Sequence, residues 1–208
     1  MDVFDEPLAR ISKKLRVVQQ RPPARKALGE REHHFRLEPA LGERQVQAFE
    51  GLHGIKLPAD HRAFVTRLGN GGAGPYYGLL PLDQWGKAAL AYGTDEGALP
   101  RDLLSRDSPL RDGLTGVDWI ELLGGDRPRR FDPRAWHPYQ GTLALCHLGA
   151  THYALLVVTG SARGRVCNVD LDMQAPKFSP EKSFLEWYEA WLDDVLHGKD
   201  ITAFGYRH

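Results

Sequence analysis

The spacing of apolar residues predicts a helix near the start of the chain, over residues 5–20. Leu8, Ile11, Leu15 and Val18 recur at helical spacing, with basic residues between them. The next stretch, RPPARKALGEREHH, is polar and contains proline, which is typical of a linker or surface segment. We therefore expect residues 1–36 to form an N-terminal helical extension, followed by a main domain at 37–200 and a C-terminal tail at 201–208.

Two further helices are predicted before residue 70. The first starts at Glu43 and has Gly54 as a suitable stop. The second starts at Leu57-Pro58, because the missing N–H of proline costs nothing in a first turn, and the glycine-rich run 69–72 ends it. The apolar faces are Val46, Phe49 and Leu52 in the first helix, and Phe64, Val65 and Leu68 in the second. Residues 76–82, aromatic and apolar, then predict a buried strand.

Residues 142–172 carry the clearest strand pattern in the chain. Runs at 142–148, 151–159 and 165–172 are separated by short glycine-containing turns, which predicts a three-stranded antiparallel meander. In the last run Val169 and Leu171 point to one face, whereas Asn168, Asp170 and Asp172 point to the other. Residues 93–140 are rich in Gly, Asp, Arg and Pro and predict loops with short helices.

A helix near the C-terminus is predicted from both its start signal and its apolar face. Ser183 and Glu186 fit a capping box, with Ser179-Pro180 as an alternative start, and Gly198 is a suitable stop. The apolar face consists of Phe184, Leu185, Trp187, Tyr188, Trp191, Leu192, Val195 and Leu196. The remaining positions Glu186, Glu189, Asp193 and Asp194 are acidic, so we expect the helix to pack on the sheet with these carboxylates outward.

The charge balance argues against a dedicated nucleic-acid binder. Lys+Arg and Asp+Glu both number 27, so there is no basic excess to neutralise phosphates. Basic runs around residues 10–16 and 127–134 are expected to be solvated surface, with the second run, beside Phe131 and Trp136, as a minor candidate for contact with nucleic acid or anionic lipid. The N-terminus lacks an apolar signal core and no run reaches the length of a membrane span, so we expect a cytoplasmic protein that does not enter a membrane.

Three segments in this order resemble the SUKH superfamily of immunity and regulatory proteins. They are GIKLPADHRAFVTRLGNGGAGPYYGLLPL, GTLALCHLGATHYALLVVTGSARGRV and FLEWYEAWLDDVL, and the resemblance spans residues 41–197. It implies an α+β fold, a single domain with a curved, mainly antiparallel sheet covered by helices. One departure is Cys167, at a position where the family commonly carries Trp. The resemblance also implies a protein-binding role, because many bacterial members are thought to neutralise toxins and fungal relatives act as regulatory hubs.

No catalytic constellation, metal site or cofactor is expected. The glycine-rich segment GNGGAGP ends a helix and lacks the Gly-Lys-Ser/Thr sequence of a phosphate loop. His147 and His152 flank a turn and could lie opposite each other, but Cys146 points to the other face and no third ligand has a suitable spacing. Cys146 as a nucleophile, or Asp170 with Asp172 as paired acids, is the basis of a distant enzyme alternative.

The leading hypothesis is an immunity protein that neutralises a toxin, for example a nuclease, by direct binding. The alternative is a regulatory scaffold without a toxin partner. In both cases the partner is a protein, with no direct nucleic-acid contact and no small-molecule cofactor expected. The candidate binding residues are the acidic residues Glu186, Glu189, Asp193, Asp194, Asp170 and Asp172, which would steer a basic partner, together with Tyr76 and Tyr77. Tyrosine is enriched at binding hot spots, and strand alternation suggests that one of these two lies in the core and the other outside.

Overall fold

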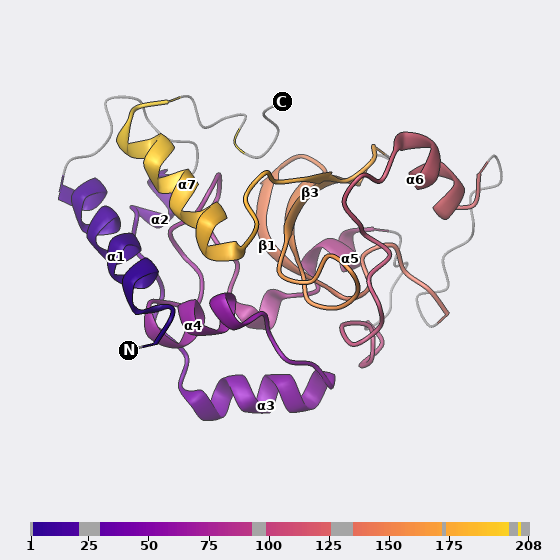
Figure 1. Cartoon of the computed structure of the whole chain (residues 1–208), viewed down its shortest axis with the longest axis horizontal. Coiled ribbons are helices and arrows are strands. Elements are labelled where there is room, and N and C mark those ends of the chain that lie inside the picture. The colour runs from indigo at the N-terminus through magenta and orange to yellow at the C-terminus, as the bar shows by residue number, and fades with distance from the viewer. Residues whose placement is uncertain are drawn as a thin grey trace.

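The computed structural model describes residues 2–20, 30–92, 99–125, 135–171, 174–199 and 204. The described elements are α1 (Asp5–Gln20), α2 (Glu30–His33), α3 (Glu43–His53), α4 (Ala59–Arg67), the 3₁₀ turn η1 (Leu82–Gln84), α5 (Lys87–Ala91), α6 (Gly116–Leu122), β1 (Thr142–Gly149), β2 (His152–Val157), β3 (Val166–Asp170), β4 (Lys177–Phe178) and α7 (Phe184–Leu196). Helices α1, α4 and α7 lie on one side of the sheet and α6 on the other (Figure 1). The fold is α+β, as predicted. In the described part of the chain, no helix is long and apolar enough to cross a membrane.

The sheet is an open antiparallel meander in the order β1-β2-β3-β4. This confirms the three predicted strands, and the two-residue β4 adds a fourth that was not predicted. The pairing of β1 with β2 shifts between Ala144 and Cys146 and again between His147 and Gly149. At the first shift Leu145 has no partner in β2, and Leu145 and Cys146 both join the same core cluster.

Both faces of the sheet are buried, in two separate hydrophobic clusters. The larger cluster joins one sheet face, including Leu156, to apolar residues of α1, α4 and α7. The smaller joins the opposite face, including Leu155, to Trp119 of α6 and to Tyr139. Leu155 and Leu156 belong to different clusters because successive strand residues point to opposite faces.

The prediction of a strand at residues 76–82 is wrong. The backbone turns here, with positive φ at Tyr76 (53°) and Gly78 (97°), which no extended strand adopts. Leu79 alone forms isolated bridges, to Gly72 and to Cys146. The aromatic and apolar composition was correct as a sign of burial but not of strand geometry.

The segment after this turn covers the outer edge of β1 through two backbone hydrogen bonds. The Leu80 amide donates to the Leu145 carbonyl at 2.7 Å, and the Ala144 amide donates to the Trp85 carbonyl at 2.8 Å. An uncovered strand edge is a template for pairing with another chain. The edge of β1 is therefore partly capped within the molecule.

The glycine-rich run after α4 is a close-packed junction. Gly72 has a φ of 90°, and a Cβ at this position would clash with the Arg36 carbonyl. A Cβ on Gly78 would clash in turn with the Gly72 carbonyl. The glycines are thus needed for close backbone approach and positive φ, in agreement with the turn interpretation.

Helix α7 has Ser183 as its N-cap, as its sequence predicts, but the Glu186 carboxylate does not bond back to the Ser183 amide as the predicted capping box requires. The Ser183 hydroxyl oxygen accepts a hydrogen bond from the Glu186 amide at 3.3 Å, which satisfies one of the open donors of the first turn. The Glu186 carboxylate accepts from the Lys182 amide at 2.8 Å. Gly198, with a φ of 65°, follows the end of the helix. Of the predicted apolar face only Leu196 is exposed, at 37%.

Helix α3 differs from its prediction in which side chains it buries. Val46 is fully buried, as expected, but Leu52 is 63% exposed. The buried neighbour is instead Glu50, at 1% exposure. The apolar pattern missed this because a carboxylate is buried only where tertiary partners compensate its charge.

Helix α1, which the sequence analysis assigned to an extension, packs against α7. Its four periodic apolar residues, Leu8, Ile11, Leu15 and Val18, are at most 5% exposed and belong to the larger core cluster. Burying four such side chains stabilises the folded chain by about 6–12 kcal/mol before chain entropy is subtracted. Helix α1 is therefore part of the folded core.

Candidate protein-binding surface

Each of the four acidic residues predicted on α7 has a partner within the chain. Glu186 accepts the hydrogen bond from the Lys182 amide described above. Asp193 forms an ion pair with Lys14 at 2.6 Å. Asp194 is only 8% exposed and pairs with Lys199 at 2.8 Å. These contacts reduce the net negative charge that α7 offers to another molecule.

Glu189 is held by two basic residues of α1. Arg10 donates to both carboxylate oxygens, each at 2.9 Å, and the Lys14 ammonium lies 2.9 Å from one of them. The hydrogen bonds from Arg10 lower the pKa of Glu189; partial burial opposes this, and Lys14 lowers the pKa further. The Glu189 side chain is only 15% exposed, so it does not lie on an open acidic face as the sequence analysis expected.

Asp170 is also engaged internally. It is 7% exposed and accepts a hydrogen bond from the Thr151 hydroxyl at 2.8 Å. The His152 Nε2 lies 3.5 Å from its other oxygen. Asp172, expected on the same strand face, lies outside the described residues.

The two candidate tyrosines have different surroundings. Tyr76 is 6% exposed and part of the larger core cluster, whereas Tyr77 is 46% exposed. The Tyr77 ring stacks on His147, with centroids 5.8 Å apart and an interplanar angle of 22°. The division into one core and one outer tyrosine agrees with the prediction, although a turn and not a strand produces it.

The two histidines near the β1–β2 turn are not cross-strand neighbours. His147 pairs with Tyr153 in the register, and His152 pairs with Gly149. Their expected opposition is wrong because the irregularity between Ala144 and Cys146 shifts the pairing by one residue; the register of Ala144 with Leu155, continued without it, would have placed His147 opposite His152. The His147 Nε2 lies 3.0 Å from the Ala150 carbonyl oxygen, a contact within the turn.

These contacts form two groups at the β1–β2 end of the sheet: Tyr77 with His147, and Thr151 and His152 with Asp170. We call the group Tyr77, His147, Thr151, His152 and Asp170 the turn surface. The Tyr77 ring also lies beside the turn itself, 3.8 Å from where a Cβ on Gly149 would stand. The turn surface combines an exposed aromatic ring with polar groups that are fixed by hydrogen bonds or ring contacts.

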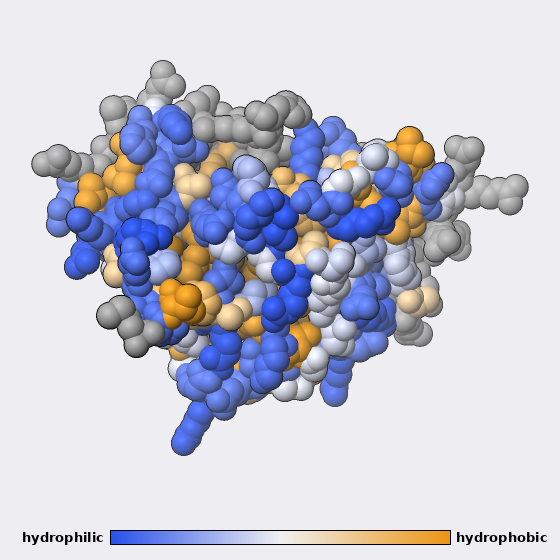
Figure 2. Space-filling model, in the orientation of Figure 1, coloured by the Kyte–Doolittle hydropathy of each residue, from blue (hydrophilic) through white to orange (hydrophobic). Residues whose placement is uncertain are grey.

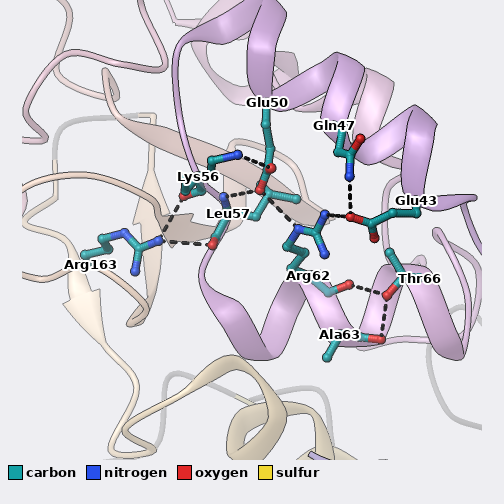
Figure 3. A network of polar contacts seen from close by, with 9 residues as sticks. All are labelled: Glu43, Gln47, Glu50, Lys56, Leu57, Arg62, Ala63, Thr66 and Arg163. Carbon is teal, nitrogen blue, oxygen red and sulfur yellow. Dashed lines mark hydrogen bonds and ion pairs between the residues drawn. The ribbon is translucent and has the colours of Figure 1, made fainter.

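A buried carboxylate that the sequence analysis did not single out lies between α3 and α4 (Figure 3). Glu50 contacts Lys56 at 3.1 Å and Arg62 at 3.3 Å, and accepts from the Leu57 amide at 3.0 Å. Burial raises the pKa of Glu50, but the Leu57 hydrogen bond and the two cations outweigh it, so the pKa is below its usual value. Arg62 also pairs with Glu43.

The same loop is held from the other side by Arg163, from the turn between β2 and β3. Its guanidinium donates to the carbonyls of Lys56 and Leu57 at 2.9 and 3.0 Å (Figure 3). Together with Glu50, this fixes the segment that leads into α4. The carboxylate oxygens are occupied by these partners, so we assign Glu50 a structural role.

Neither cysteine lies in an environment that favours the reactive thiolate. Cys146 and Cys167 are fully buried, and burial raises the pKa of Cys146 far above its usual value and that of Cys167 to about 12. The thiolate is the reactive form, and a thiol in this environment stays protonated at neutral pH. Among the described residues, no group of three or more His, Cys, Asp or Glu is arranged to hold a metal ion.

The visible face of the molecule is mostly hydrophilic, with hydrophobic residues in separate patches, one of them over α6 (Figure 2). Comparisons with family models, with curated proteins and with solved structures found no match for this chain. The basis for a functional assignment is therefore the geometry of the residues described above and the resemblance of the sequence to the SUKH superfamily.

Proposed function

We propose that the chain is a cytoplasmic, non-enzymatic protein-binding module of the SUKH type that neutralises a toxin by direct binding. The observation that carries the proposal is the half-exposed Tyr77, whose ring is held by stacking on His147. A tyrosine offers a large contact area with only two rotatable side-chain angles, and ordering it in advance lowers the entropy lost on binding.

The rest of the turn surface supplies polar recognition. His152 and Thr151 are each fixed by Asp170, so their orientation is set before a partner arrives. A binding surface with an aromatic centre and ordered polar groups around it is the usual arrangement at protein interfaces. The module would act by covering its partner's active or binding site, with no covalent chemistry.

In this proposal the acidic residues of α7 matter less for partner binding than the sequence analysis expected. Three of the four acidic residues of α7, Glu189, Asp193 and Asp194, are paired with Arg10, Lys14 and Lys199, so a strong negative field is not what selects the partner. Paired surface charges contribute little to affinity. We therefore assign specificity to the turn surface and only a minor steering role to α7.

Co-expression with the product of the adjacent gene tests the proposal. We expect that product alone to reduce host survival, and this chain to restore survival and to co-purify with it as a one-to-one complex. A product that is harmless and forms no complex would contradict the toxin-neutralising function. Recovery of several unrelated partners in its place would favour the regulatory scaffold, which the same resemblance allows.

A further inference from the structure

A groove outside the turn surface lies along η1 and α5. Its volume is about 470 Å³, within the range of pockets that bind ligands. The lining residues are Asp83, Gln84, Trp85, Gly86, Lys87, Leu90 and Leu99. Leu90 is 47% exposed, so apolar surface is open to solvent here.

The groove is built on a fixed frame. The Trp85 ring meets His53 edge-on, with centroids 5.0 Å apart, and its carbonyl accepts the hydrogen bond from Ala144 of β1. Gly86 allows Leu99 to approach closely, since a Cβ on Gly86 would clash with a Leu99 methyl group. The groove is therefore tied to the edge of the sheet, and a ligand would not need to order it.

The rim of the groove carries one acidic and one basic side chain. Asp83 and Lys87 are both exposed, and neither forms an ion pair with another residue of the described part of the chain. This contrasts with Glu189, Asp193 and Asp194 of α7, which are paired with basic side chains. An occupant that complements this rim has one apolar group together with both a negative and a positive charge.

We propose that the groove binds a segment of a partner protein that inserts one aliphatic or aromatic side chain between an acidic and a basic residue. The apolar side chain packs against Trp85, Leu90 and Leu99, while Lys87 and Asp83 pair with the flanking charges. Mixed charge at the rim disfavours nucleic acid and anionic lipid, which require a uniformly basic site. The inference deepens the proposed function by adding an anchor site to it.

The test uses a random twelve-residue peptide library displayed on phage and selected against the whole chain. We expect enriched peptides with the stated pattern. They should bind Leu90→Ala about tenfold more weakly, since about 1.4 kcal/mol corresponds to tenfold in affinity. Lys87→Glu should select against the acidic residue of the peptide.

Two matched variants serve as controls. Leu52→Ala removes an exposed leucine from α3, at 63% exposure against 47% for Leu90, and Lys13→Glu reverses an exposed lysine of α1; both should leave peptide affinity unchanged. Because Leu90 and Lys87 are exposed, their variants should keep the melting temperature of the parent. Enriched peptides that bind Leu90→Ala as tightly as the parent, or no enrichment at all, would overturn the groove assignment.

The outcome is separable from that of the proposed function. If the co-expressed partner forms its one-to-one complex but no peptide depends on Leu90, the groove assignment fails and the proposed function stands. If peptides depend on Leu90 but no toxin complex forms, the groove assignment stands and the toxin-neutralising function fails.

Discussion

Arg10 in α1 donates two hydrogen bonds of 2.9 Å to the carboxylate of Glu189 in α7, 179 positions away in the sequence. Both helices are amphipathic, and their apolar faces share one core cluster. The ion pair lies at the border of that contact. It therefore sets the register between the first and last described helices, while apolar burial supplies most of the energy.

A double-mutant cycle with Arg10→Ala and Glu189→Ala should give a coupling free energy of about 1 kcal/mol. This is the upper end for surface pairs, as the geometry is bidentate but the Arg10 side chain is 47% exposed. Because the folded-state pKa of Glu189 is lowered, its contribution is present above its unfolded pKa and is lost as pH falls through the folded value. Urea unfolding at pH 7 and pH 3 measures the coupling free energy and its loss in acid. If the losses of unfolding free energy in the two single variants simply add up in the double variant at pH 7, the pairing of Arg10 with Glu189 is contradicted.

Local sequence signals predicted the elements better than the contacts between them. The Ser183 cap and the apolar face of α7 act within one helix, so the sequence was enough to place it. The pairing of Glu189 with α1 depends on tertiary packing, which no local pattern contains. The turn at Tyr76 was missed for a related reason, since its positive φ is imposed by the glycine-rich junction around Gly72 and Gly78.

The candidate site was predicted only in part. Tyr77 stands out in sequence as an aromatic residue after a flexible run, and it is exposed. Its stacking partner His147 depends on the irregular register of β1 and β2, and the hydrogen bond from Thr151 to Asp170 depends on the pairing of β2 with β3. Glu50 could not be distinguished from a surface glutamate, because its burial depends on the positions of Lys56 and Arg62.

Replacing Glu50 should destabilise the fold. In Glu50→Ala the buried Leu57 amide loses its acceptor, which costs about 1–3 kcal/mol. Arg62 keeps Glu43, and Lys56 is exposed to water. Denaturant unfolding measures the loss. Glu43→Ala, which removes the exposed partner of Arg62, is the control and should cost less than about 1 kcal/mol. Equal effects of the two variants would show that Glu50 does not fix the loop into α4.

The buried His61 should make the fold less stable in mild acid. Burial lowers its pKa from 6.5 to about 4, so the unfolded chain binds a proton more readily between these values. Stability therefore rises with pH across this window and is fully present above about pH 6.5. Going from pH 7.5 to pH 5 should cost about 2 kcal/mol for this one group.

The variant His61→Leu measures how much His61 contributes to the pH dependence of the unfolding free energy. It removes the titrating ring that meets Phe184 edge-on at 4.7 Å while keeping an apolar side chain. The difference in unfolding free energy between pH 7.5 and pH 5 should shrink by about 2 kcal/mol. Burial also lowers the pKa values of His33 and His137 to about 4, so these two residues should account for the pH dependence of the unfolding free energy that remains in the variant. An unchanged difference would mean that His61 is protonated in the folded state.

Charge reversal on α7 should lower the stability of the fold. A triple variant with lysine at Glu186, Glu189 and Asp193 places positive charges beside Arg10 and Lys14, so we expect a fall of several degrees in the melting temperature. Calorimetry at 0.05 and 0.5 M salt checks the cause, since screening should recover part of the loss. A melting temperature equal to the parent's would contradict the α1–α7 ion pairs.

The most direct test of the protein-binding account is the affinity of Tyr77→Ala for the partner recovered by co-expression, measured by calorimetric titration. We predict a loss of about thirtyfold, corresponding to the hot-spot threshold of about 2 kcal/mol, with the melting temperature unchanged. Ile120→Ala, at 49% exposure on α6 against 46% for Tyr77, should bind like the parent. Equal affinities for Tyr77→Ala, Ile120→Ala and the parent would contradict the turn surface as the binding site.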